Sequence, residues 1–228
     1  MAGGAVSNST YTSKDTGAKQ GSYLFPLILV TSLFFLWVLA YGLLDVLNKH
    51  FQEVLNVTTK RSTLLQGAYF GAYFLMALPA GMFMNKFGYK KGIILGLLLY
   101  AIGAFLFYPA AGALNFDFFL LALFILACGL ACLETAANPY VTVLGSPETS
   151  EQRLNLSQCF NGLGSFLGPI IGGKLFFGIG KGNLTTVQLT YIVIGVVVLL
   201  IAGCVYRTPL PEIKEAEQEG KEVMEDTR

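Results

Sequence analysis

The sequence reads Leu-Glu-Thr-Ala-Ala-Asn-Pro-Tyr over residues 133–140, inside an apolar segment that covers residues 118–144. Glu134 thus carries a carboxyl group into a segment of membrane-spanning length, where a charge costs at least about 2.5–3.5 kcal/mol. Asn138 lies four residues on and shares its helical face, and Pro139 removes a backbone donor, which weakens the helix locally. An acid, an amide and a weakened helix at one depth are typical of a substrate site in a discontinuous transporter helix.

The composition indicates a protein that crosses a membrane several times. Of its 228 residues, 54% are hydrophobic and only 13% are charged, and the mean hydropathy is +0.60. Soluble domains contain about 25% charged residues. Each apolar run is long enough to cross about 30 Å of hydrocarbon at about 1.5 Å per residue. These runs predict six transmembrane helices, over residues 23–47, 62–84, 91–109, 118–144, 154–178 and 188–206.

The basic residues predict how the helices are oriented. If both termini lie on the same side, ten of the fifteen Lys and Arg residues fall on that side and the other five on the opposite side. Because basic residues are enriched in cytoplasmic segments, we expect both termini in the cytoplasm. The chain then divides into a disordered cytoplasmic tail (residues 1–22), a six-helix transmembrane bundle (23–206) and a charged cytoplasmic linker (207–228).

Charge and cysteine content exclude several other classes of protein. The formal net charge is +1 and the basic residues occupy short connecting stretches, so there is no basic face for nucleic acid. The four cysteines lie in apolar spans and the only histidine is His50, which leaves no metal-ligand or thiol-nucleophile spacing. The acids stand alone, without a nucleophile–base pair, so we expect no enzyme activity, no metal and no cofactor.

Polar residues divide the six predicted helices into two kinds. The third and the sixth have no charged or amide side chain in their middle and can face lipid. The other four carry polar stripes at the three- and four-residue steps of one helical face. The stripes are Trp37, Tyr41 and Asp45; Gln66, Tyr69 and Tyr73; Glu134 and Asn138; and Gln158, Asn161 and Ser165. Because the first helix of each triplet bears the acid and the third is apolar, we expect two inverted three-helix repeats.

Each stripe also has a structural interpretation. The polar groups of the second helix are compatible with ordinary hydrogen bonds between helices, and Trp37 and Tyr41 with an aromatic belt at the membrane interface. Asp45 approaches the outer end of its span, where polar anchors are common. Glu134 is the stronger functional candidate, because ionisable groups inside membrane segments are rare. The alternative is that Glu134 lies among the lipid headgroups near a helix end, or that it makes a purely structural hydrogen bond.

Several motifs resemble one family of carriers. The runs LETAANPYVTVLG (133–145), RLNLSQCFNG (153–162), FFLW (34–37) and FLMALPAG (74–81) are similar to segments of the L-fucose permease family of sugar–proton symporters. This family is a branch of the major facilitator superfamily, whose signature between helices two and three resembles GMFMNKFGYKK (81–91). The resemblance covers about residues 24–208. It implies an all-α membrane protein whose six transmembrane helices form one half of a major-facilitator transporter.

The resemblance also implies roles for individual residues. Asp45 and Glu134 match the two acids that the family uses for proton coupling and sugar binding. Gln158 and Asn161 match amides that line the sugar cavity. We therefore expect proton-coupled uptake of a monosaccharide by alternating access, in which proton binding and sugar binding favour each other.

Four more residues complete the predicted substrate site. Asn138 and Gln66 extend the set of hydrogen-bonding groups, and Trp37 or Tyr41 is suited to cover the apolar face of a sugar ring. Gly42 stands where the fucose-specific member of the family has a polar residue. Fucose, glucose, galactose and an amino sugar are therefore all open as substrates.

Members of this family resemble two six-helix halves joined by a cytoplasmic linker, and the sequence ends inside what resembles that linker. We expect either a fragment whose C-terminal half is missing or a half-size carrier that pairs with a second copy, in a bacterial inner membrane. A non-transport membrane subunit is a further alternative. Such a subunit would pack through Gly164, Gly168 and Gly172, which have the spacing of closely approaching helices.

Overall fold

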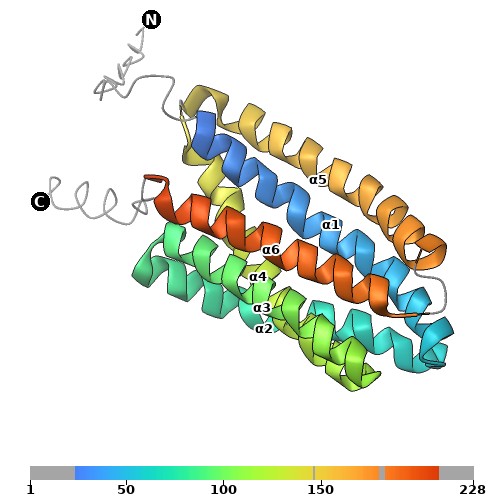
Figure 1. The fold of residues 1–228 in the computed structure, drawn as a ribbon. Coiled ribbons are helices and arrows are strands. Elements are labelled where there is room, and N and C mark those ends of the chain that lie inside the picture. The colour runs from blue at the N-terminus through green and yellow to red at the C-terminus, as the bar shows by residue number, and fades with distance from the viewer. Residues whose placement is uncertain (1–23, 146, 180–182, 211–228) are drawn as a thin grey trace, which may run out of the picture.

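The structure is a computed structural model that describes residues 24–145, 147–179 and 183–210. Within these ranges the chain forms a bundle of six long helices (Figure 1). They are α1 (Leu24–Val54), α2 (Thr59–Phe87), α3 (Tyr89–Ala113), α4 (Phe116–Val143), α5 (Ser150–Gly172) and α6 (Thr185–Arg207). A 3₁₀ helix, η2 (Pro147–Thr149), precedes α5, and a π-helical segment, η3 (Gly173–Ile179), continues it. All six helices are long and apolar enough to span a membrane, which confirms the predicted all-α membrane fold.

The helices are longer than the apolar runs that predict them. For example, α1 continues seven residues beyond residue 47, to Val54, because hydropathy marks only the part of a helix that lies in hydrocarbon. Capping sets the ends instead. At the start of α4, the Asn115 side chain accepts hydrogen bonds from the backbone N–H groups of Asp117 and Phe118 (2.9 and 3.3 Å). Gly88 alone joins α2 to α3, with a φ of 93° that other residues rarely adopt.

The two predicted terminal segments lie largely outside the described residues. This applies to the whole of residues 1–22 and to the linker at 207–228 except for its first four positions. Where α6 ends, the Lys90 side chain donates hydrogen bonds to the backbone oxygens of Tyr206 and Thr208 (3.0 and 2.8 Å). A cation at a helix C-terminus is stabilising, so Lys90 holds the end of α6 against the start of α3.

Helix pairing follows the two triplets. α1 packs along α5 and α4 packs along α2, so the first helix of each triplet lies against the second helix of the other. This exchange is the relation expected of two inverted repeats. α3 packs between α4 and α6, because Gly96 and Gly103 admit the α4 helix at close range. Half of its most apolar segment is buried inside the bundle, so only part of α3 is left to face lipid.

The glycine row of α5 forms the seam with α1. A Cβ atom on Gly164 would lie 2.7 Å from the backbone oxygen of Phe35, and one on Gly168 would lie 2.9 Å from the Cα atom of Gly42. Real Cβ atoms essentially never approach so closely. The row therefore serves helix packing, as its small-residue spacing predicts.

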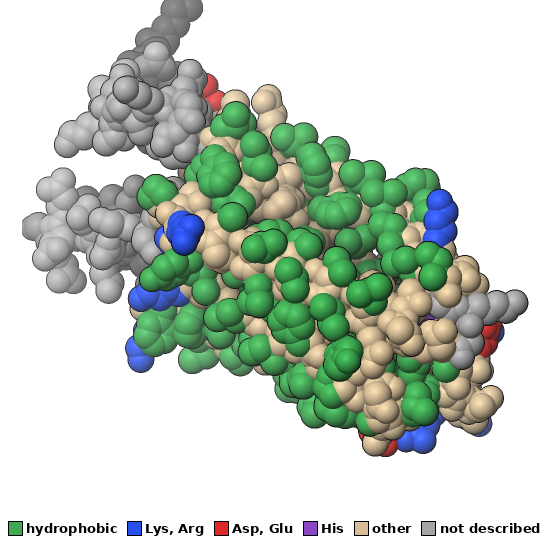
Figure 2. All heavy atoms as spheres, viewed as in Figure 1, with side chains coloured by type: hydrophobic (Ala, Val, Ile, Leu, Met, Phe, Trp, Pro, Cys, Tyr) green, Lys and Arg blue, Asp and Glu red, His purple; other side chains and the backbone are tan. Residues whose placement is uncertain are grey.

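α2 and α5 are the least covered helices of the bundle. Only 22% of the most apolar segment of each is buried, against 61% for α1 and for α4. Their exposed side chains include Phe74 (83% exposed) and Leu78 (78%) on α2, and Phe166 (68%) on α5. Figure 2 shows apolar side chains over one face of the bundle, with Lys and Arg gathered toward its two ends. Such a distribution suits a bundle surrounded by hydrocarbon.

Candidate functional site

A cleft of about 370 Å³ opens where α1, α2, α4 and α5 meet. Aromatic side chains form much of its wall, and one acid and one amide reach into it. Its lining residues are Trp37, Val38, Tyr41, Tyr69, Phe70, Tyr73, Glu134 and Asn161. Tyr73 lies fourteen residues from either end of α2, so the cleft lies about halfway across the bundle.

A second cleft, of about 300 Å³, adjoins the first and shares Tyr73 and Glu134 with it. Its other lining residues are Ala77, Ala131, Thr135 and Asn138. The Asn138 side chain donates a hydrogen bond from Nδ2 to the backbone oxygen of Glu134 (3.1 Å). Glu134 is half-buried and stands between the two clefts, so a ligand in either one would contact it.

Two tyrosine hydroxyls of α2 connect to the Glu134 carboxyl of α4. The Tyr69 hydroxyl donates to the Tyr73 hydroxyl (3.2 Å), and the Tyr73 side chain is hydrogen-bonded to Glu134. The two tyrosine rings stack with their centroids 5.0 Å apart, which keeps both hydroxyls on the same side. In the described part of the chain, the partner of the Glu134 carboxyl is thus the Tyr73 hydroxyl and not a Lys or Arg side chain. Glu134 can therefore gain or lose a proton without breaking an ion pair.

The second predicted acid, Asp45, does not line either cleft. Gln66 donates a hydrogen bond from Nε2 to Asp45 Oδ1 (2.9 Å), and the Asp45 side chain is exposed. Gln66 precedes Tyr73 by seven residues on the same face of α2, a separation of about 10 Å along the helix axis. The two acids therefore lie at different depths, and the polar face of α2 runs between them.

The main cleft brings together half of the eight predicted site residues, namely Trp37, Tyr41, Glu134 and Asn161. Gln158 is exposed on α5 and lines neither cleft. It precedes Asn161 by three residues, so their side chains differ in direction by about 60° around the helix. The side chains of these two amides therefore point in only approximately the same direction from α5, as the predicted stripe required.

α4 is continuous through Pro139, so the weakening that the sequence predicts at this point does not interrupt the helix. The helix runs on to Val143. Two threonine hydroxyls bond to the backbone on either side of the proline: Thr135 donates to the Ala131 oxygen (2.8 Å) and Thr142 to the Pro139 oxygen (2.7 Å). The polar cluster around the acid therefore rests on an unbroken helix.

Tyr69 and Tyr73 are not among the site residues that the sequence predicts. Both lie on the polar stripe of the second predicted helix, from which only Gln66 is assigned to the site. Their spacing from Gln66, three and seven residues, is a signal that they share its face. Their contact with the acid, however, depends on how α2 packs against α4, and periodicity within a single helix carries no information on that packing. Phe70 lines the cleft outside this stripe.

Arg153 closes the end of α4. The sequence places it in a loop, but it lies in the first turn of α5 and is only 9% exposed. Its guanidinium donates hydrogen bonds to the backbone oxygens of Val141 (3.2 Å) and Thr142 (2.7 Å). Because a cation stabilises the negative end of a helix, Arg153 anchors the segment of α4 that follows the acid and the amide.

Known proteins resemble this chain in both sequence and fold. Residues 27–225 match the family model of the Major Facilitator Superfamily. The chain is 40% identical over 235 residues to the L-fucose-proton symporter of Escherichia coli (strain K12), a match that covers 94% of this chain and 54% of that protein. It is 38% identical over 205 residues to the glucose/galactose transporter of Brucella abortus biovar 1 (strain 9-941), covering 88% of this chain and 50% of that protein.

The fold is similar to the crystal structure of a Major Facilitator Superfamily transporter, FucP, in the outward conformation. The TM-score is 0.71 at 41% sequence identity, and the match covers 83% of this chain and 51% of that one. The chain thus spans about half the length of the curated relatives that it matches.

Proposed function

Because this chain belongs to the major facilitator superfamily, we propose that it forms the N-terminal half of a secondary active transporter that takes up a hexose-type sugar together with a proton. The observation that carries this proposal is a half-buried acid, Glu134, hydrogen-bonded to a tyrosine hydroxyl beside an aromatic cleft halfway across a membrane-spanning bundle. Intramembrane acids of this kind mark proton and substrate pathways.

The chemistry of the cleft suits a monosaccharide. A sugar presents an apolar ring face and several hydroxyl groups, and the cleft offers aromatic rings from Trp37 and Tyr41 with polar groups from Glu134 and Asn161. The names of the relatives, an L-fucose-proton symporter and a glucose/galactose transporter, support a hexose or deoxyhexose. The further roles of Gln158, Asn138 and Gln66 in sugar binding rest on the resemblance and on the polar stripes.

Proton coupling follows from the state of the acid. While Glu134 is ionised, the Tyr73 hydroxyl is held as a donor to the carboxylate. A proton on Glu134 removes the charge and releases that hydroxyl, which then donates to a sugar hydroxyl. Protonation and sugar binding favour each other, and by linkage the coupling is the same in both directions. Asp45 lies nearer the C-terminal end of α1, where it pairs with Gln66. We propose it as the second proton-binding group.

Alternating access needs a second bundle to move against. The uncovered apolar faces of α2 and α5 flank the cleft, and we assign them to a C-terminal six-helix half. A second copy of this chain in that place would make a self-pairing half-size carrier. Both termini are proposed to lie in the cytoplasm of a bacterium, with the bundle in the inner membrane, because basic residues are in excess on that side.

The test is transport in proteoliposomes with a pH gradient. Labelled L-fucose, galactose and glucose are supplied to the 228-residue chain alone and together with a separately expressed second half. Saturable, gradient-dependent uptake of one of these sugars by the assembled pair is expected, and none by the chain alone, which offers only one wall of the site. Uptake by the chain alone would instead establish a half-size carrier, and no uptake in either case would contradict the function.

Binding has its own readout. Trp37 is the only tryptophan of the 228 residues and lines the cleft, so sugar binding should change its fluorescence. A Trp37→Phe variant of the assembled protein identifies the part of the signal that comes from this residue. A sugar that is transported without altering the Trp37 signal would exclude this cleft as the site.

A further inference from the structure

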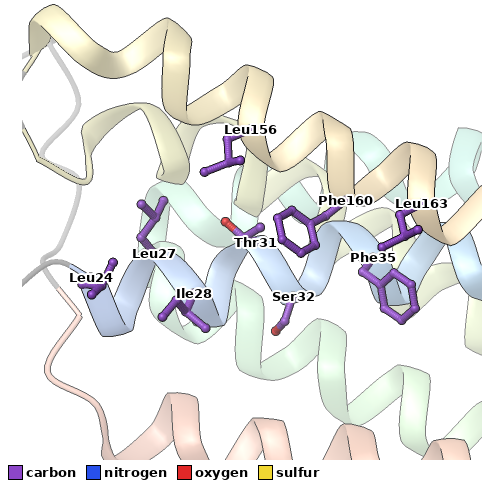
Figure 3. Close-up of a pocket in the computed structure, with 9 residues that line it drawn as sticks. All are labelled: Leu24, Leu27, Ile28, Thr31, Ser32, Phe35, Leu156, Phe160 and Leu163. Carbon is purple, nitrogen blue, oxygen red and sulfur yellow. The ribbon is translucent and has the colours of Figure 1, made fainter.

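A groove of about 430 Å³ lies between α1 and α5, at the end of the bundle where α1 begins (Figure 3). Its lining residues are Leu24, Leu27, Ile28, Thr31, Ser32, Phe35, Leu156, Phe160 and Leu163. None of these residues lines either of the clefts around Glu134. This α1/α5 groove is therefore a separate site, and what it binds is a separate question.

The wall of the groove offers carbon and no hydrogen-bonding group. The Thr31 hydroxyl is hydrogen-bonded to the Ser157 hydroxyl (3.1 Å), and the Ser32 hydroxyl donates to the Leu29 oxygen (2.6 Å). The other lining residues are all Leu, Ile or Phe. A sugar in this groove would exchange its hydrogen bonds with water for none with protein, which is unfavourable. The occupant is therefore apolar.

The length of the groove matches one leaflet of a membrane. From Leu24, the first residue of α1, to Phe35 is eleven residues, or about 16 Å along the helix. The hydrocarbon core of a bilayer is about 30 Å thick, so the groove runs from the membrane surface to about the midplane. A transmembrane helix would extend across both leaflets, whereas the acyl chain of a phospholipid ends where the groove ends.

The groove exists because α6 does not repeat the packing of α3. In the first triplet, α3 packs extensively against α4, the first helix of the other triplet. In the second triplet, α6 packs against α3 and is not in extensive contact with α1. Stacking of Tyr191 on Phe107, with centroids 3.9 Å apart, holds α6 in that place. If α6 packed against α1 as α3 packs against α4, it would cover this side of α1. Because it does not, this side of α1 is left open.

The charge at this end of the bundle favours an anionic headgroup. In the described residues, five basic side chains lie at this end against two acidic ones, Glu148 and Glu151. The basic residues are Lys86, Lys90, Lys91, Arg153 and Arg207, of which Lys86, Lys91 and Arg207 are exposed, as are both acidic residues. Figure 2 shows Lys and Arg side chains at this end, next to the apolar surface. Basic residues at a membrane surface attract anionic lipids.

We propose that the α1/α5 groove binds one acyl chain of an anionic phospholipid from the adjacent leaflet, with its headgroup at the level of Leu24 and Arg207. The lipid fills the groove between α1 and α5, and so supports the α1–α5 seam that carries Trp37 and Asn161. This site is independent of the proposed transport function and is tested without it.

The occupant can be identified by photo-crosslinking. The 228-residue chain carries p-benzoylphenylalanine in place of Phe160, in vesicles with equal amounts of phosphatidylglycerol and phosphatidylcholine of identical acyl chains. A matched protein carries the same group in place of Phe166, which is exposed on α5 outside the groove. We expect phospholipid adducts at position 160 that are enriched about fivefold in phosphatidylglycerol, the effect of one basic residue. Adducts at position 166 should follow the lipid composition.

Two further variants locate the lipid. Leu163→Trp fills the groove and should reduce the adduct at position 160 several-fold without changing that at position 166. Arg207→Gln should keep the adduct at position 160 but lower its phosphatidylglycerol enrichment. Equal adducts at the two positions, or crosslinks from position 160 to a second copy or to other residues of the same chain, would overturn the proposal. Circular dichroism checks that each variant is folded.

Discussion

A double-mutant cycle on Tyr73 and Glu134 tests whether α2 and α4 are joined through the proposed proton site. Tyr73→Phe removes the hydroxyl and keeps the ring that stacks on Tyr69. Glu134→Ala removes the acceptor. Tyr69 loses its own hydrogen-bond acceptor in every protein that carries Tyr73→Phe, so this loss cancels in the cycle. What remains is the coupling between the hydroxyl and the carboxyl.

The expected coupling is about 1–2 kcal/mol. Hydrogen bonds to charged groups contribute about 1.5–3 kcal/mol in soluble proteins. Hydrogen bonds between membrane helices average about 0.6 kcal/mol and reach about 1.7, because the separated helices find other partners. Glu134 is only half-buried and lines two open clefts, so water competes for the carboxyl and keeps the value below the upper end of the first range.

The coupling is measured as the free energy of unfolding of the 228-residue chain in bicelles, from denaturation curves of the four proteins in the cycle. A parallel cycle pairs Glu134→Ala with Tyr41→Phe. Tyr41 lines the same cleft, but its hydroxyl makes no hydrogen bond in the described part of the chain, so the two changes should add to within about 0.5 kcal/mol. Equal coupling in both cycles, or none for Tyr73, would refute the contact between the hydroxyl and the acid.

Three further predictions concern coupling, binding and packing. In the assembled carrier, Asp45→Asn should abolish sugar-induced alkalinisation of the external medium while sugar affinity changes little, and unchanged alkalinisation would exclude Asp45 from coupling. Glu134→Gln should bind sugar with an affinity independent of pH, and a pH dependence equal to that of the wild type would place the proton elsewhere. Gly168→Ala should destabilise the chain by about 1–3 kcal/mol, because its Cβ meets the backbone of α1. Gly162→Ala, which faces open space on the same helix, should leave the chain as stable or more stable, and thermal unfolding compares the two.

The fold was accessible to sequence analysis because the membrane constrains it strongly. A helix must satisfy its own backbone inside hydrocarbon, so apolar length alone predicts six helices. Exact boundaries were not accessible, since caps such as Asn115 and the single-residue link at Gly88 act outside the hydrocarbon. At Pro139 the sequence predicts the loss of one backbone donor but not whether the helix ends there, and α4 continues to Val143.

The candidate site was only partly accessible. Polar stripes bring Trp37, Tyr41 and Asn161 to the same cleft as the acid. They do not mark the buried face of every helix, since Asp45, Gln158 and Ser165 are exposed. Stripes do not show the depth at which two helices meet. For this reason the sequence assigns Asp45 and Glu134 a shared role in proton coupling without giving their separation. In the bundle, Gln66, the partner of Asp45, lies about two turns along α2 from Tyr73, the partner of Glu134. The α1/α5 groove depends on the absence of one helix–helix contact, which no pattern within a helix reports.

In the proposed carrier, assembly and substrate binding would use the same surface of this bundle. The cleft is open on the side where α2 and α5 are uncovered, and the exposed Phe70 belongs both to the cleft wall and to the uncovered face of α2. A partner bundle that buries the apolar faces of α2 and α5 therefore also closes the cleft over Glu134. Closure removes water from the acid and strengthens its electrostatic interactions. The free energy of proton binding at Glu134 then depends on whether the two bundles are together or apart at this face, which is the dependence that a proton-driven carrier requires.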